Sequence, residues 1–222
     1  MHLAMFAKFW EAGKVKTRLA ATIGPEQARD VYLAFLDHLI RKLDALADLR
    51  TLVYSPPEHE SSFRERFPDS WQLHPQADGD LGTRMRTFFE TFGESAEQKN
   101  ILIGSDAPDV PQEYIVQAAE LLDEVPVVFG PSTDGGYYLI GMRGKPVNVF
   151  EDIPWSTEQV MQSTISLMES QQISYRLLPE WTDVDEVDDF RNLLNRLKSA
   201  EGSGAEQRLL DALLAMELPG VS

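Results

Sequence analysis

The chain has 222 residues and a formal net charge of −16, and it contains no cysteine. Its length predicts one α/β domain, or one domain with a small addition. The lack of cysteine excludes disulfides, Cys-ligated zinc, iron–sulfur clusters and thiol catalysis. The negative charge repels nucleic acid and anionic membranes, so neither is an expected partner. No apolar run is long enough to span a bilayer and no signal-peptide pattern opens the sequence, so we expect a cytoplasmic protein.

Short apolar runs alternate with longer amphipathic segments along the chain. The runs predict strands at His2–Ala7, Thr51–Tyr54, Trp71–His74, Asn100–Ile103, Val125–Phe129, Tyr137–Met142 and Ser174–Leu178. The segments predict a long helix that opens at Gly24-Pro25 and helices at Ser61–Phe67, Thr83–Phe92, Gln112–Leu122, Thr157–Glu169, Val187–Leu197 and Ala205–Met216.

This alternation predicts an α/β fold, a three-layer α/β/α sandwich with a mostly parallel central sheet. We expect one domain over residues 1–200. Gly202–Gly204 predicts a break, so residues 201–222 are expected to form a C-terminal helical extension. The apolar face of that extension would pack on the body of the protein or on a second subunit of a homodimer. Ligands of such sheets bind beyond the carboxyl ends of the strands, so the polar clusters that follow the strands are candidate sites.

The first cluster places Lys8, Lys14, Lys16 and Arg18 within 11 positions of a very acidic chain. Lysine and arginine offer positive charge to phosphate oxygens, and Gly13 allows a close backbone approach. The pattern therefore favours a phosphate-binding loop over the alternative, a basic loop that is merely solvated. It is not a P-loop, because neither Ser nor Thr follows Gly13-Lys14.

The second cluster, Gln76–Met85, has glycines at positions 79 and 82 directly before a predicted helix. Backbone groups there could read a base edge or approach a phosphate. Alternatively, Asp80 is the N-cap of the helix and the glycines form a turn.

The third cluster follows the strand that ends at Ile103. Asp106 at the end of a buried strand is a candidate Mg²⁺ ligand, because magnesium binds one or two carboxylates together with phosphates and waters. Asp109 is expected to be a cap or a loop former, although it could also orient an acceptor.

The fourth cluster combines a glycine turn at Gly130–Tyr137 with the acidic run Thr182–Asp189. The turn carries Asp134, and its alternative interpretation is an ordinary hairpin. In the acidic run, Asp183 and Asp185 precede a helix and are candidate metal groups. The run is not the start of a haloacid-dehalogenase fold, because most of that fold's sheet would have to follow the motif and too little chain remains.

Five motifs in order, FAKxxxxGxVKTRL, GDLGTRM, GSDAPD, GPSTDGGYYLIG and DVDEVDDF, resemble the rSAM/selenodomain-associated transferases of the glycosyltransferase-A superfamily. They are also similar to those of the 2-phospholactate and molybdenum-cofactor guanylyltransferases. The resemblance implies a nucleotide-diphospho-sugar-transferase fold over about residues 1–197. It departs at Trp10, where the family usually has Pro, and the first loop lacks the GxG of sugar-nucleotidyltransferases.

The resemblance also implies roles for individual residues. The implied catalytic, phosphate-binding residues are Lys8, Lys16 and Arg18, and the implied nucleotide-binding residues are Ala7, Gly13, Thr17, Gln76, Gly79 and Gly82. The implied ligands of Mg²⁺ or Mn²⁺ are Asp106 and Asp185, and the implied acceptor-binding residues are Asp134, Gly135, Gly136 and Trp155.

These residues predict a magnesium-dependent transferase, with nucleotidyl transfer from a nucleoside triphosphate to a small phosphorylated or hydroxyl acceptor as the leading hypothesis. A cationic loop suits a triphosphate better than a nucleotide-sugar, which favours this hypothesis over its alternative, glycosyl transfer from a nucleotide-diphospho-sugar. A non-catalytic nucleotide-binding module is the alternative from another class, and it predicts binding without turnover.

Overall fold

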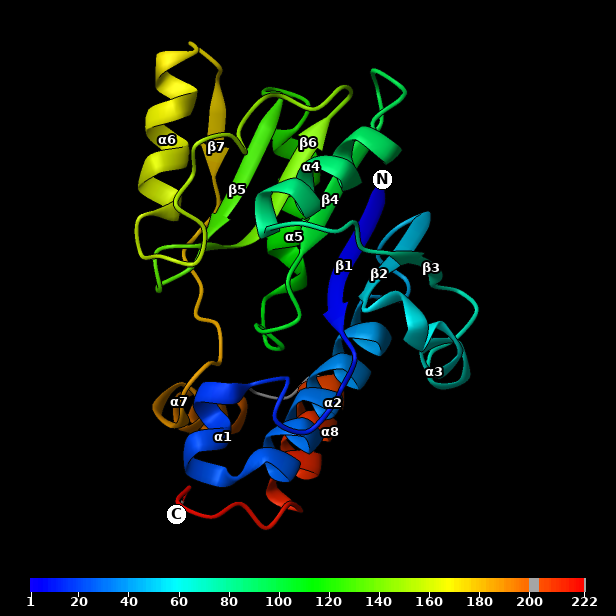
Figure 1. The fold of residues 1–222 in the computed structure, drawn as a ribbon, viewed down its shortest axis with the longest axis vertical. Coiled ribbons are helices and arrows are strands. Elements are labelled where there is room, and N and C mark those ends of the chain that lie inside the picture. The colour runs from blue at the N-terminus through cyan, green and yellow to red at the C-terminus, as the bar shows by residue number, and fades with distance from the viewer. Residues whose placement is uncertain (200–203, 222) are drawn as a thin grey trace.

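The computed structural model describes residues 1–199 and 204–221, and seven strands of this part form one sheet (Figure 1). The strands are β1 (His2–Lys8), β2 (Leu49–Ser55), β3 (Gln72–Pro75), β4 (Lys99–Ile103), β5 (Val127–Pro131), β6 (Tyr137–Arg143) and β7 (Tyr175–Leu177). Their order across the sheet is β3-β2-β1-β4-β6-β5-β7. Only β6 runs antiparallel to its neighbours, so the predicted mostly parallel sheet is confirmed.

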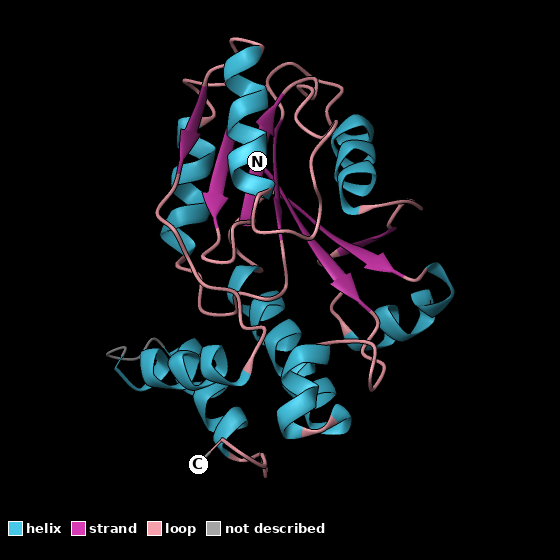
Figure 2. Ribbon diagram, turned by 60° about the vertical axis from the view of Figure 1, so that its left-hand side comes forward, coloured by secondary structure: helices cyan, strands magenta, loops and turns pink. Residues whose placement is uncertain are grey.

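Helices cover both faces of this sheet (Figure 2). They are α1 (Thr17–Ile23), α2 (Pro25–Leu43), the short 3-10 helix η1 (Pro57–His59), α3 (Glu60–Arg66), α4 (Leu81–Phe92), α5 (Gln112–Leu121), α6 (Val160–Ser170), α7 (Val187–Ser199) and α8 (Gly204–Leu214). Apolar residues of α2, α3 and α5 pack on one face, and those of α4 and α6 pack on the other. The three-layer α/β/α prediction is therefore confirmed. None of the described helices has the length and apolar character that a membrane span requires.

A separate helical cluster lies beyond the end of β1, at the bottom of Figure 1. It joins α1, the first half of α2, α7 and α8 around one apolar core. The α8 residues Leu209, Leu210 and Leu213 are buried in this core, and Lys42 of α2 pairs with Glu206 of α8 at 3.1 Å. The apolar face of the predicted extension thus packs on the body of the same chain. Of the predicted break, Gly204 is the first residue of α8, and Gly202 and Ser203 lie outside the described residues.

The sequence prediction missed α1, which begins directly after the cationic loop. Its seven residues carry only Leu19 and Ile23 as buried apolar positions, too short a pattern to show a helical period. The prediction also began α6 three residues early. Ser156 has a φ of 64°, which is incompatible with a helix, and Thr157 Oγ1 donates to the carbonyl of Pro154 instead.

His38 of α2 is a buried titratable group inside the helical layer. Its side chain faces α8, and Nε2 has no hydrogen-bond partner among the described residues. Burial, followed by the nearby charge of Lys42, lowers the pKa of His38 from 6.5 to about 4. The unfolded chain therefore binds a proton at a pH where the folded protein does not.

We predict that acidification destabilises the protein through His38. Because the folded pKa is the lower one, stability is complete above pH 6.5 and falls as the pH drops towards 4. Between pH 7 and pH 5 the loss from this residue should be about 2 kcal/mol. Urea unfolding at the two pH values should show a smaller loss for His38→Gln than for the wild type. Equal losses in the two proteins would contradict this account.

Candidate functional site

A cavity of about 1590 Å³ opens at the edge of the sheet where β1, β3, β4 and β5 end. Loops after these strands line it, together with the segments before α6 and α7. Among the predicted site residues, those that line it are Ala7, Lys8, Lys16, Thr17, Arg18, Gln76, Gly79, Asp106, Asp134, Gly135, Gly136, Trp155 and Asp185. The tertiary structure thus brings four separate sequence clusters to one place. Gly13 and Gly82 lie outside the lining.

Lys16 is the buried centre of the charged part of the cavity. Its side chain is only 2% exposed, and its Nζ contacts Asp106 Oδ1 and lies 3.5 Å from Asp185 Oδ1. The same ammonium donates to the carbonyl of Val184 at 2.6 Å and lies 5.8 Å from the centre of the Phe35 ring. An ammonium has three donors, and these three oxygens account for them, which is what a buried charge requires.

The backbone at Lys16 explains how the side chain reaches this position. Its φ of 47° and ψ of 45° lie in the left-handed region, directly before the first residue of α1. A non-glycine residue adopts this conformation only where surrounding contacts hold it. The contacts with Asp106, Val184 and Asp185 provide that hold. Gly13, with a φ of 77°, supplies a second left-handed turn in the loop rather than a wall of the cavity.

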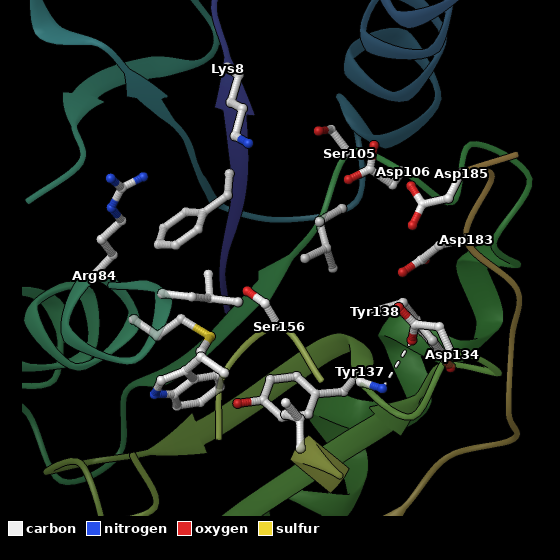
Figure 3. A pocket seen from close by; sticks show the side chains of 18 of the residues that line it. Lys8, Arg84, Ser105, Asp106, Asp134, Tyr137, Tyr138, Ser156, Asp183 and Asp185 are labelled. Atoms are coloured by element: carbon white, nitrogen blue, oxygen red, sulfur yellow. Dashed lines mark hydrogen bonds between the residues drawn. The ribbon is translucent and has the colours of Figure 1, made fainter. Parts of the chain in front are cut away.

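Three further cations face the cavity with more solvent access. Arg18 is 64% exposed, and its Nη1 lies 3.4 Å from Asp185 Oδ2. Lys8 projects into the cavity from the end of β1 (Figure 3), and Lys14 lines the same side. The backbone N–H of Lys8 donates to the hydroxyl of Tyr32, which anchors the start of the loop to α2. The exposed cations are free to neutralise an anionic ligand.

Three carboxylates gather opposite these cations, as Figure 3 shows for Asp106, Asp183 and Asp185. The pKa of Asp183 is raised to about 7, mainly by burial and also by the charges of Asp106 and Asp134. The charge of Lys16 acts in the other direction. Asp106, Asp183 and Asp185 together therefore carry more negative charge than Lys16 alone neutralises.

This donor set fits a hard divalent cation. Among the described residues, no three carboxylate or imidazole side chains are grouped closely enough to hold a metal by themselves. Magnesium requires only one or two carboxylates, completed by substrate phosphates and waters. Asp106 and Asp185 both face the ammonium of Lys16. A cation bound by these two carboxylates would also offset the negative charge around Asp183. Asp106 and Asp185 are the residues that would hold Mg²⁺ or Mn²⁺.

The Gln76–Gly82 segment is tied to the sheet. Gln76 Nε2 donates to the carbonyls of Val53 at 2.9 Å and Ala7 at 3.3 Å, while its Oε1 accepts from Arg84. Asp80 accepts from the N–H of Thr83 and caps α4, so the capping alternative is correct. The carboxamide of Gln76 is thus engaged within the protein, and its recognition of a base stays a prediction.

The glycines around the cavity act through close packing. A Cβ at Gly82 would lie 2.4 Å from Nε1 of Trp155, so only glycine lets the indole lie against the start of α4. A Cβ at Gly135 would lie 2.1 Å from the carbonyl oxygen of Glu158. These two close approaches place the segment 155–159 against the start of α4 and against the Asp134 loop.

The Asp134 loop connects β5 to the antiparallel β6, so the hairpin alternative is also correct. Asp134 Oδ1 accepts from the N–H of Gly136 at 2.9 Å, and its carboxylate still faces the cavity (Figure 3). The suggestion that Asp109 orients an acceptor is wrong. Its side chain is 6% exposed, lies outside the cavity lining and binds Arg196 and the indole of Trp181.

Several lining residues were missed from the sequence, namely Phe6, Tyr32, Arg84, Tyr137 and Ser156. Tyr137 stood inside one of the quoted motifs and could have been found there. Phe6 and Arg84 also stood inside quoted motifs, and Ser156 follows Trp155 directly, so each could have been found in the same way.

Comparison with known proteins identifies the family. The sequence pattern of DUF2064, described as an uncharacterized protein conserved in bacteria, matches residues 39–157. The chain belongs to this family. A crystal structure from Desulfovibrio desulfuricans G20, described as a "putative nucleotide-diphospho-sugar transferase", is 31% identical over 96% of each chain with a TM-score of 0.86. No curated protein matches the chain.

More distant structures share the fold. Rv0371C from Mycobacterium tuberculosis H37Rv, solved in complex with manganese, is 18% identical with a TM-score of 0.50 over 87% of this chain and 98% of that one. The inositol-1-phosphate CTP transferase from T. maritima is 12% identical with a TM-score of 0.53 over 100% and 97% of the two chains. The predicted nucleotide-diphospho-sugar-transferase fold is therefore confirmed.

We predict that Lys16→Met destabilises the protein and creates a response to divalent cations. Loss of the ammonium leaves Asp106 without its cationic partner and Asp185 with Arg18 alone, which should cost about 1–3 kcal/mol. Millimolar Mg²⁺ should recover much of this loss in the variant and change the wild type little, as measured by thermal unfolding. Lys145→Met, at an exposed position outside the cavity, is the matched control. A variant that Mg²⁺ does not stabilise would contradict the account.

Proposed function

We propose that this protein is a Mg²⁺-dependent nucleotidyltransferase that uses a nucleoside triphosphate and a small phosphorylated or hydroxyl acceptor. The observation that carries the proposal is the meeting of exposed cations with the Asp106–Asp185 pair in one cavity. A triphosphate bound through a metal ion needs both kinds of group, one to hold the metal and one to neutralise the outer phosphates.

The structural relatives support this proposal. The T. maritima neighbour is a CTP transferase by its description, and the Rv0371C structure contains manganese. The motifs of this chain are also similar in order to those of two guanylyltransferase families, which use triphosphate donors.

Each residue has a role in the proposed reaction. Asp106 and Asp185 would hold the metal, which supplies positive charge to the α-phosphate. An oxygen of the acceptor would attack the α-phosphorus, the bond from that phosphorus to the bridging oxygen of the β-phosphate would break, and pyrophosphate would leave. Where the acceptor is a hydroxyl, its proton passes to solvent. Lys8 and Arg18 would neutralise the charge on the leaving pyrophosphate, while Lys16 holds Asp106 and Asp185 in place. Asp134, in the turn between β5 and β6, lines the same cavity and would face the acceptor.

A second candidate function is glycosyl transfer from a nucleotide-diphospho-sugar. The description of the Desulfovibrio relative, which is 31% identical, favours it. The same carboxylates and cations would then stabilise a departing nucleoside diphosphate. We place it second because the loop offers three accessible cations, Lys8, Lys14 and Arg18, more than a diphosphate leaving group requires.

We predict that a nucleoside triphosphate stabilises the protein only when Mg²⁺ is present. At about a hundred times its dissociation constant, the ligand should add roughly 2.7 kcal/mol to the free energy of unfolding. A thermal-shift series with CTP, GTP, ATP and UTP, each with and without Mg²⁺, checks this. A shift with UDP-glucose or GDP-mannose and none with any triphosphate would support glycosyl transfer instead.

Asp106→Asn should remove the Mg²⁺-dependent part of the stabilisation, because it replaces a charged metal ligand with a neutral one. Asp69→Asn is its matched control, since Asp69 is exposed and lies outside the cavity. If Asp106→Asn binds the magnesium–nucleotide complex as well as the control does, the metal assignment is wrong. Pyrophosphate release with added acceptors separates catalysis from binding alone.

A further inference from the structure

The size of the cavity shows that one substrate does not fill it. Sites for single small ligands have volumes of roughly 300–1,000 Å³. The cavity here, at about 1590 Å³, is larger and has room for a nucleotide and a second molecule. The charged groups accounted for by the proposed function occupy the part near Lys16, Asp106 and Asp185. The remaining part is therefore where the second molecule would lie.

The wall of this remaining part is apolar and aromatic. Its side chains come from β1, α4, β6, the segment before α6 and the first residue of α6, and they are Phe6, Met85, Tyr137, Ile140, Trp155 and Val160. Two charged residues border this wall, Glu158 and Arg84. Arg84, labelled on that side in Figure 3, donates to the carbonyl of Gly79 and to Gln76 Oε1. The six side chains of the wall itself offer an apolar surface to a ligand.

Close packing keeps this wall in shape without a ligand. Gly82 makes room for the indole of Trp155, and the ring of Trp155 meets that of Tyr137 edge-on at 6.4 Å. Gly135 accepts a hydrogen bond from the N–H of Met161 at 2.8 Å, which fixes the start of α6 against the Asp134 loop. A wall held by backbone contacts is a preformed surface, as ligand sites generally are.

Two neutral hydroxyls accompany the wall. Ser156 has the left-handed φ of 64°, and Figure 3 shows its side chain between Arg84 and Tyr137 on the cavity side. The hydroxyl of Tyr137 is buried and has no hydrogen-bond partner among the described residues. A buried hydroxyl without a partner is costly, and a strained serine persists only where other contacts hold it. The Ser156 hydroxyl, on the cavity side, suits a ligand with a neutral polar atom on an apolar body.

The sheet order indicates which substrate meets this wall. Asp106 follows β4, in the middle of the sheet. The cationic loop and Gln76 follow β1 and β3 on one side, whereas Tyr137, Trp155 and the Asp134 loop belong to the β6 side. A donor held by the β1 side places its α-phosphate at Asp106, so the molecule on the β6 side is the one that attacks it.

We propose that the acceptor is a hydroxyl compound with an uncharged, apolar ring or chain, and that Trp155 and Ser156 select it. This inference rests on the proposed function for its direction of transfer, but not for the chemistry of the wall.

The test uses 2-phenylethanol as an apolar probe, with glycerol and glycerol 3-phosphate as polar and charged probes. Saturation-transfer NMR should detect 2-phenylethanol on the wild-type protein and neither glycerol compound. Trp155→Ala should bind 2-phenylethanol roughly tenfold more weakly, whereas Trp155→Phe should retain it. Leu177→Ala, an exposed apolar position on β7, is the control and should bind as the wild type does. Added CTP with Mg²⁺ should not displace the probe, and its thermal shift should be equal in all four proteins.

Three results would overturn the inference. In the first, glycerol 3-phosphate binds the wild-type protein and 2-phenylethanol does not. In the second, CTP displaces 2-phenylethanol. In the third, Trp155→Ala loses the thermal shift that CTP causes. Either of these two results would mean that the wall holds the nucleobase, and the proposed function would survive. If 2-phenylethanol binds as expected and no triphosphate does, the apolar acceptor site stands and the nucleotidyl proposal fails.

Discussion

The ammonium of Lys16 is the contact around which the site is organised. It joins the loop after β1 to Asp106 after β4 and to the segment 183–185 before α7, three parts of the chain that are far apart in sequence. The Val184 carbonyl, which receives one of its donors, belongs to a residue whose N–H donates to the carbonyl of Asp106. Removing the lysine would leave the like charges of Asp106 and Asp185 together without the ammonium between them.

This contact also explains how a protein of such negative charge can offer a place to an anion. The surrounding field repels phosphates at long range, so attraction must be local. Lys8, Lys14 and Arg18 remain accessible because Lys16 alone takes the buried position between Asp106 and Asp185. The division between one buried cation and several exposed ones makes the loop both a structural tie and a binding surface.

The second constraint is the packing of the 155–159 segment between α4 and the Asp134 loop. Glycine at positions 82 and 135 permits approaches that any side chain would block. The segment carries Trp155 and the left-handed Ser156 into the cavity, so the apolar wall depends on backbone geometry as much as on side-chain chemistry. The charged half of the cavity is thus held together by electrostatic contacts, and the apolar half is held by close steric packing.

The sequence by itself determined the layers of the fold and the membership of most of the site. Apolar residues recur every two residues in a strand and every 3.6 residues in a helix, and this local pattern is visible in the sequence. For that reason every predicted strand and most predicted helices were correct. Polar clusters after strands predicted the cavity, because parallel strands carry their following loops to one edge of the sheet. It did not predict α1 or the start of α6, where short length and a strained Ser156 override the pattern.

Only the tertiary structure decided how the predicted residues are used. Lys16 lies between the carboxylates rather than simply beside a phosphate position, and Gln76 binds the sheet through its carboxamide. Asp109 resembles Asp106 in sequence but is buried against Arg196, while Gly82 acts by leaving space for Trp155. These outcomes depend on contacts between residues distant in sequence, and no local pattern records which side chain will meet which.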